Sequence, residues 1–98
     1  MSLYVLTPAA EDDVRAILAY VEQDNPSIVD RVRDGLRDAM RLLAERPGLG
    51  HTRRDLASET VRFWPVYKYL IIYRPDTRPL EIVRVLRGKR DVRQILEV

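Results

Sequence analysis

A chain of 98 residues has material for one hydrophobic core, which predicts a single domain over residues 1–98 and excludes a multi-domain organisation. Hydrophobic residues at 46% and charged residues at 33% exclude a disordered chain, and the absence of cysteine excludes disulfides and thiolate metal sites. The net charge of +2 is unevenly distributed, because residues 1–45 hold five Lys/Arg against nine Asp/Glu (−4) and residues 46–98 hold twelve against six (+6).

The first half of the chain has the pattern of one strand followed by two helices. Residues 3–6 form an apolar run long enough for a strand. The Thr-Pro pair at 7–8 fits an N-cap and first helical position, and predicts a helix to about Asp24. The Asn-Pro pair at 25–26 repeats the signal and predicts a second helix to about Arg46. Apolar stripes at helical spacing should face a core, namely Val14, Ile17, Leu18 and Val21, then Val29, Val32, Leu36, Met40 and Leu43.

Two further features of these helices have local interpretations. The acidic residues at 11–13 lie near the positive end of the first helix dipole, which explains them better than a metal site does. Gly35, in the second helix, is predicted to mark a close crossing of the first helix. The two helices should form an antiparallel hairpin.

The period changes from helical to extended after a polar loop that runs to about Thr60. Residues 61–66 are aromatic and β-branched, and Pro65 among them indicates an edge strand or a bulge. Residues 69–73 form a continuous apolar run, typical of a central strand buried on both faces, and residues 80–87 form the last strand after a turn. The predicted fold class is therefore α+β, in the order β-α-α-β-β-β, with the helical hairpin across one face of an antiparallel meander.

Few residues offer catalytic or metal chemistry. His51 is the only histidine, and no neighbour in the sequence would orient it as a general base, so a solvated loop histidine is favoured over a catalytic one. No Gly-rich phosphate loop or nucleophile elbow is present. Catalytic residues, metal and cofactor are therefore all expected to be absent.

Cations and aromatic residues interleave in the predicted strands, as they do in binding surfaces and in platforms that stack on unpaired bases. The alternative is that the aromatic residues are core and the cations keep strand edges soluble. Arg84 lies between Val83 and Val85, where an unpaired charge is costly, and should have a partner in this chain or another. With the basic C-terminal half, this pattern favours nucleic acid or an acidic protein segment as partner. The predicted binding residues are Arg62, Trp64, Tyr67, Lys68, Tyr69, Arg84, Arg87, Lys89 and Arg90.

The element order and three stretches of sequence resemble the ParE branch of the ParE/RelE toxin superfamily over nearly the whole chain. The stretches are Pro47-x-x-Gly50, Tyr69-Leu70-Ile71-Ile72-Tyr73-Arg74 and Val83-Arg84-Val85-Leu86-Arg87-Gly88-Lys89-Arg90-Asp91. The resemblance implies a bacterial, cytoplasmic toxin of a type II toxin–antitoxin system, which inhibits growth. In that branch the toxin inhibits DNA gyrase, and the C-terminal segment of a ParD-like antitoxin wraps it in a hetero-oligomer. Acidic residues of such a segment could pair with Arg84, Arg87 and Arg90.

RelE-like members of the superfamily instead cut messenger RNA on the ribosome. They carry an arginine on the central strand, where this chain has Leu70, and a tyrosine or histidine near the C-terminus, which is missing after Arg90. Arg87 stands where many ParE-like toxins have histidine. The nuclease set is incomplete, so the resemblance favours a gyrase-binding toxin, with a ribosome-dependent endonuclease as the alternative and an inactive co-repressor subunit as a third interpretation.

Overall fold

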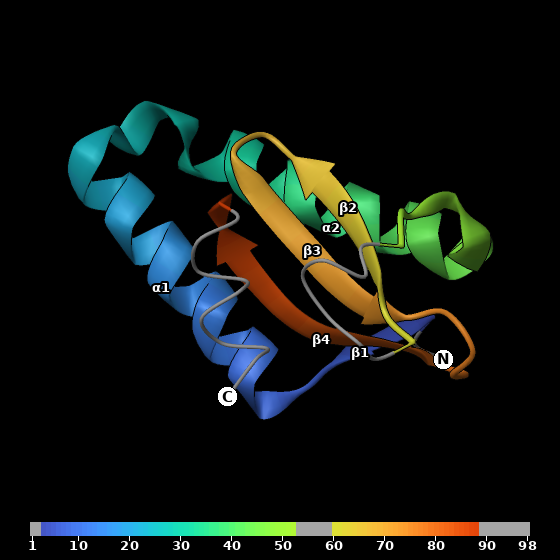
Figure 1. Ribbon diagram of the computed structural model, residues 1–98. Coiled ribbons are helices and arrows are strands. Elements are labelled where there is room, and N and C mark those ends of the chain that lie inside the picture. Colours follow the sequence, from blue (N-terminus) through green and yellow to red (C-terminus); the bar gives the residue numbers. More distant parts are fainter. Residues whose placement is uncertain (1–2, 53–59, 89–98) are drawn as a thin grey trace.

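In the computed structural model, which describes residues 3–52 and 60–88, two helices cover one face of a four-stranded sheet (Figure 1). The strands lie in the order β1-β4-β3-β2, with β1 parallel to β4 and the other neighbours antiparallel. The elements are β1 (Tyr4–Leu6), α1 (Pro8–Asp24), α2 (Val29–Glu45), β2 (Arg62–Val66), β3 (Tyr69–Arg74) and β4 (Leu80–Arg87). This arrangement confirms the predicted fold class.

Local signals in the sequence place the helix boundaries. The hydroxyl of Thr7 accepts a hydrogen bond from the N–H of Ala10 at 3.1 Å and caps α1, as expected from the Thr-Pro pair. The Asn-Pro pair at 25–26 starts a short 3-10 turn, η1 (Pro26–Ile28), before the α-helix begins. A second such turn, η2 (Pro47–Leu49), follows α2. The helix ends are therefore within a few residues of the predicted ones.

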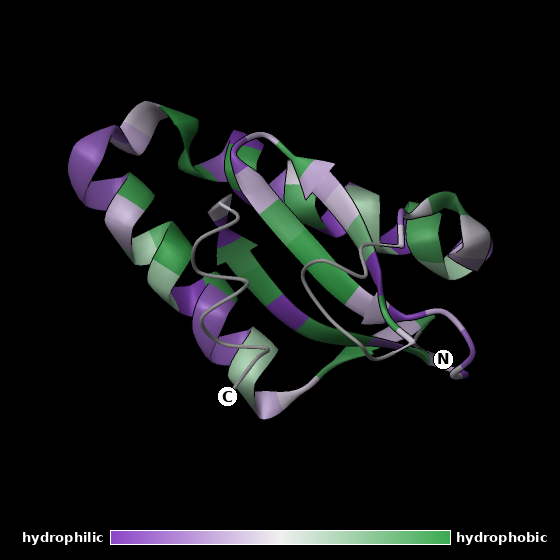
Figure 2. Cartoon of the chain, in the orientation of Figure 1, coloured by the Kyte–Doolittle hydropathy of each residue, from purple (hydrophilic) through white to green (hydrophobic). Residues whose placement is uncertain are grey.

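The main core lies between the helices and the sheet, and the apolar sides of the helices face it (Figure 2). Leu43 of α2 and Ile71 of β3 are fully buried there. A smaller cluster covers the other face of the sheet, around Phe63 and Ile72. Because neighbouring residues of β3 enter different clusters, the strand is buried on both faces, as its continuous apolar run predicted.

Strand β2 forms one edge of the sheet, which agrees with the edge position indicated by Pro65. The backbone of Phe63 points away from β3 and exchanges two hydrogen bonds of 2.8 Å with His51. Strand backbone groups alternate in direction, so the missing N–H of Pro65 falls on the same outer side. The proline therefore removes no hydrogen bond between β2 and β3.

The turn before β2 is fixed by a buried tyrosine of β3. The Tyr73 hydroxyl donates to the carbonyl of Pro47 at 2.6 Å and accepts from the N–H of Gly50 at 2.8 Å. A side chain at position 50 would collide with the Tyr73 ring, so only glycine fits there. Burial raises the pKa of Tyr73, against smaller lowering effects of the Gly50 N–H and the charge of Arg62.

Gly35 is explained by a different neighbour from the one predicted. A Cβ at this position would lie 2.7 Å from Cε2 and 2.8 Å from the hydroxyl of Tyr67. Tyr67 comes from the turn between β2 and β3, so the prediction that Gly35 marks the crossing of α1 is wrong. The glycine makes room for an aromatic ring that lies on α2.

Candidate binding site

The predicted binding residues do not form one surface, and two of the aromatic ones are engaged in packing. Tyr69 is 5% exposed and belongs to the main core. Trp64 is half-buried against the same core, and its ring stacks on that of His51 with centroids 6.4 Å apart. His51 itself is exposed. Both predicted residues therefore contribute to the fold, and Tyr69 has almost no surface to offer a partner.

Arg84 has its partner inside the chain, which was one of the two predicted alternatives. Its Nε and Nη2 donate to the two carboxylate oxygens of Asp13 at 2.7 and 2.8 Å, a bidentate pair. The two side chains are only 23% and 13% exposed. The hydrogen bond from Arg84 to Asp13 raises the pKa of the guanidinium, against the opposing effect of burial. Arg84 thus forms a structural ion pair with Asp13, and this pair occupies its Nε and Nη2 donors.

Asp13 also accepts a backbone hydrogen bond, so its carboxylate has contacts to the sheet in addition to its place near the positive end of the α1 dipole. One of its oxygens accepts from the N–H of Val85 at 3.0 Å. The sequence carried a signal for this role: Asp13 is three residues after the buried Ala10 and four before Ile17, on the apolar side of α1. A carboxylate on an apolar stripe needs a partner, and Arg84 was the cation predicted to need one as well.

Helix α1 closes the edge of β4 beyond the point where β1 ends. Strand β1 pairs with β4 only as far as Leu6 opposite Ile82. The N–H of Thr7 then donates to the carbonyl of Ile82 at 3.0 Å, and its hydroxyl donates to that of Val83 at 2.7 Å. The Val85 N–H donates to Asp13, so three backbone polar groups of β4 form hydrogen bonds with residues at the start of α1. The edge is therefore closed to an added strand at these positions.

The other predicted cations have different surroundings. Arg62 is half-buried and donates to the carbonyl of Gly50 at 2.8 Å, which ties β2 to the preceding loop. Arg87 is exposed, and its guanidinium lies 5.9 Å from the ring centroid of Tyr20 on α1, a cation–π geometry. The predicted residues Lys89 and Arg90 lie outside the described residues.

The turn between β2 and β3 presents two predicted residues to solvent. Tyr67 is 59% exposed, and Lys68 is exposed beside it. Tyr67 has a φ of 55°, a left-handed conformation that is unusual for a residue with a bulky side chain. Its hydroxyl donates to the carbonyl of Arg31 on α2 at 3.4 Å. The turn therefore holds an exposed aromatic ring against α2 at the cost of backbone strain.

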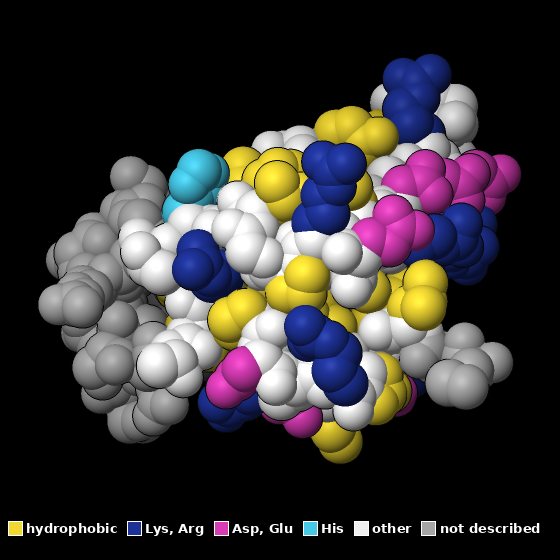
Figure 3. All heavy atoms as spheres, turned by 90° about the vertical axis from the view of Figure 1, so that its right-hand side faces the viewer, with side chains coloured by type: hydrophobic (Ala, Val, Ile, Leu, Met, Phe, Trp, Pro, Cys, Tyr) yellow, Lys and Arg dark blue, Asp and Glu magenta, His cyan; other side chains and the backbone are white. Residues whose placement is uncertain are grey.

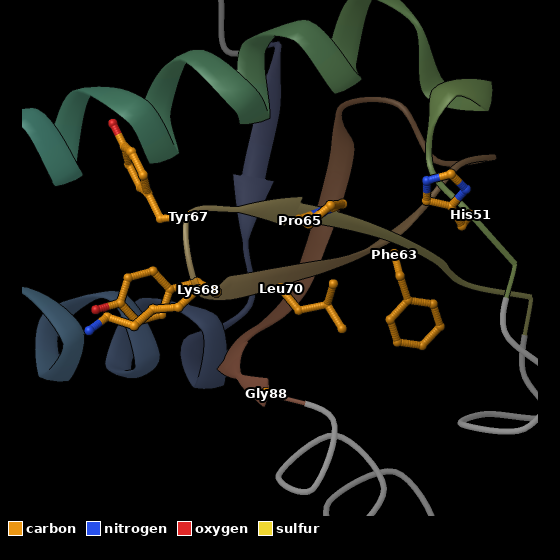
Figure 4. A pocket seen from close by; sticks show the side chains of 8 residues that line it. His51, Phe63, Pro65, Tyr67, Lys68, Leu70 and Gly88 are labelled. Atoms are coloured by element: carbon orange, nitrogen blue, oxygen red, sulfur yellow. The ribbon is translucent and has the colours of Figure 1, made fainter.

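Hollows lie on both sides of this turn, and Tyr67, Lys68 and Tyr69 line both of them. One, of about 310 Å³, opens on the outer face of the sheet, where Phe63 and Leu70 point into it. Figure 4 shows that Tyr67 points the other way, toward α2. The second hollow, of about 330 Å³, lies between this turn and the helices.

No group of three or more His, Cys, Asp or Glu side chains that could hold a metal occurs in residues 3–52 and 60–88. On the face shown in Figure 3, Lys and Arg side chains stand apart among apolar and acidic ones. Within the same part of the chain, no helix is both long and apolar enough to span a bilayer. Around the two hollows, the described residues present aromatic rings, apolar side chains and single cations.

Comparisons with known proteins identify the family. The family model described as the ParE toxin of the type II toxin–antitoxin system, parDE, matches residues 4–92. A solved structure described as the chromosomal ParDE TA system from P. aeruginosa is similar to this fold, with a TM-score of 0.70 and 17% sequence identity over 86% of this chain and 92% of that one. No curated protein matches the chain. Because the family model covers most of the chain, this protein belongs to the ParE toxins of type II toxin–antitoxin systems.

Proposed function

We propose that this ParE-family toxin blocks DNA gyrase by binding it, without catalysis, and that a ParD-like antitoxin neutralises it in a hetero-oligomeric complex. Family membership supports the class of target and partner, and the similar solved structure is described as a ParDE system. The proposal places the toxin in the bacterial cytoplasm, where its target is. Two features of the sheet favour binding over cleavage of RNA.

The first feature is the apolar surroundings of Leu70, and it is the main argument for binding over RNA cleavage. RelE-like nucleases have an arginine at the corresponding position, whereas Leu70 packs beside Phe63, Ile72 and Leu86 in the outer cluster of the sheet. An arginine placed there to stabilise phosphate charge would need polar partners, and this cluster is hydrophobic. The outer face of β3 is therefore suited to apolar contact with a protein.

Several strand cations are also committed to contacts within the chain. Arg74 donates to Glu81 at 2.8 Å, Arg84 to Asp13, and Arg62 to a backbone carbonyl. Cleavage through a 2′-hydroxyl needs a base, an acid and a cation that converge on one phosphate. The described residues bring no such set together.

Gyrase supercoiling in the presence of purified toxin tests the proposal. We expect toxin in molar excess to prevent the supercoiling of relaxed plasmid, and equimolar antitoxin to restore it because the antitoxin competes for or covers the toxin surface. The toxin–antitoxin complex, added at the same toxin concentration, is the matched control. Full gyrase activity at toxin excess would contradict the proposal.

Mapping of messenger 5′ ends after toxin expression separates the nuclease alternative. New 5′ ends at defined codon positions would show that the toxin acts by ribosome-dependent cleavage of messenger RNA and would contradict the proposed gyrase inhibition. A chain that binds the antitoxin but leaves growth unaffected would instead be an inactive member retained as a co-repressor.

A further inference from the structure

The hollow on the helix side of the β2–β3 turn has an apolar floor and an aromatic rim, and we call it the tyrosine groove. Its floor comes from three parts of the fold: Val21 near the end of α1, Ile28 and Val32 near the start of α2, and Tyr69 of β3. The volume of about 330 Å³ is large enough for one or two apolar side chains. The groove therefore has the size and the apolar lining to admit a small hydrophobic group.

The rim of the tyrosine groove consists of rings that the fold leaves in solvent. Tyr20 on α1 is 53% exposed and Tyr67 is 59% exposed, among the most exposed large hydrophobic side chains of the described residues. Tyr67 keeps this place in a left-handed backbone conformation, and Gly35 provides the space for its ring. Strain and a missing side chain that serve an exposed ring indicate a binding role, because exposed rings add little to stability and are typical contact residues.

The charges around the tyrosine groove are mainly positive. Arg31 and Lys68 line it, Arg87 lies over Tyr20, and Asp24 is the one acidic lining residue in the described part of the chain. No carboxylate of the described residues is paired with Lys68 or Arg87 at ion-pair distance. A ligand that brings carboxylates to this rim would meet cations that are available to pair with it.

We infer that the tyrosine groove docks an acidic segment of the antitoxin, which inserts an apolar side chain between Tyr20 and Tyr67 and places carboxylates beside Lys68 and Arg87. The inference rests on the proposed function for the identity of the partner. The apolar floor does not suit a phosphate backbone, and a symmetric contact of two copies through this rim would bring like charges together. An acidic segment with an apolar anchor matches both the floor and the rim.

Two rim variants test the inference in the full toxin, by isothermal titration with the protein encoded beside the toxin gene. Tyr20→Ala removes one wall and Lys68→Glu reverses one charge, and each should weaken binding by about tenfold or more. Both side chains are exposed, so the fold should persist, which circular dichroism would verify. If one variant unfolds, the other decides.

Matched controls come from the C-terminal half of α2, away from the groove. Leu42→Ala removes another exposed apolar side chain, and Arg41→Glu makes the same charge reversal. Each control should change the affinity by less than about twofold, as expected of surface positions outside the contact.

The outcomes distinguish a failure of the groove inference from a failure of the proposed function. Unchanged affinity in both rim variants, with tight binding of the wild type, would overturn the groove and leave the proposed function intact. Rim variants that lose gyrase inhibition but keep antitoxin affinity would assign the groove to the target and also overturn the inference. Failure of the wild-type toxin to bind the antitoxin would overturn both.

Discussion

Arg84 in the middle of β4 and Lys68 in the turn between β2 and β3 differ in what surrounds their charges. Both oxygens of Asp13 hold Arg84, in a pair that is mostly shielded from water. Lys68 is exposed, and no carboxylate of the described residues is paired with it. One cation is part of the structure that joins α1 to the sheet, and the other is available to a partner.

The same contrast separates two tyrosines. Tyr73 is fully buried, and its hydroxyl both donates and accepts a hydrogen bond to the backbone of the preceding loop. Tyr67 is largely exposed, in a strained backbone conformation. Interior residues with satisfied polar groups should therefore affect stability, and residues at the β2–β3 turn should affect binding. Substitutions on the two sides of this division can break it, and the largest change in stability is expected at Asp13.

Asp13→Ala should cause a loss of about 3 kcal/mol in the free energy of unfolding. The substitution leaves Arg84 as a partly buried charge and removes the acceptor of the Val85 N–H. Denaturant unfolding measures the effect. The double variant Asp13→Ala/Arg84→Ala should lose less stability than the sum of the two single losses, because it no longer contains the unpaired, partly buried charge of Arg84.

Asp12→Ala is the matched control for this change. Asp12 is adjacent in the chain, but its ion pair with Arg15 is exposed, with side chains 75% and 73% accessible. The loss should be below about 0.5 kcal/mol. Equal losses at positions 12 and 13 would show that Asp13 contributes only helix-dipole charge, and the distinction between committed and available charges would fail.

Tyr73→Phe should cost about 2 kcal/mol, because it leaves the buried N–H of Gly50 without its acceptor. The cost should also depend on pH. Burial raises the pKa of Tyr73 above its usual value of 10.0, so the folded chain keeps the proton in a range where the unfolded chain loses it. The contribution of Tyr73 is therefore fully present below about pH 10 and decreases as the pH rises further.

Denaturant unfolding of wild type and Tyr73→Phe at neutral pH and above about pH 10 measures this difference. The difference between the two proteins should shrink at high pH. Tyr20→Phe, at an exposed ring, is the control and should stay within about 0.5 kcal/mol of wild type at neutral pH. A Tyr73→Phe difference that grows with pH would mean that folding lowers the pKa of Tyr73, contrary to the effect of burial.

The sequence predicted the fold well because its signals are local. The Thr-Pro pair, the helical stripes and the continuous apolar run at 69–73 each act within a few residues, and the structure confirms them. The contacts of the candidate site were harder to predict, because they join residues that lie far apart in the chain. Asp13 and Arg84 are 71 positions apart; the sequence predicted only that Arg84 needs some partner, and it assigned Asp13 to the helix dipole.

Residue type also did not reveal which aromatic rings are exposed. Tyr67 and Tyr69 are two positions apart, yet one is exposed and the other is buried in the main core. The turn at Tyr67 reverses the chain with a left-handed residue, where sequence rules expect glycine or asparagine. The approach of this ring to Gly35 depends on the packing of α2 over the sheet, which no local pattern encodes.

Gly35→Ala should have the smallest effect and tests whether the Tyr67 ring is held rigidly. Alanine is favoured over glycine inside a helix by about 1 kcal/mol, but the new Cβ would lie 2.7 Å from the ring. Because the ring is at the end of a largely exposed side chain, it can move aside, and we expect a net change below about 1 kcal/mol. In a Tyr67→Asn background, which removes the ring and suits a left-handed backbone, the same substitution should stabilise the protein by the full helix preference. Thermal unfolding of the four proteins measures this coupling. If Gly35→Ala costs more than about 2 kcal/mol with Tyr67 present and nothing without it, the ring is locked by the fold, and Tyr67 belongs with Tyr73 among the interior anchors.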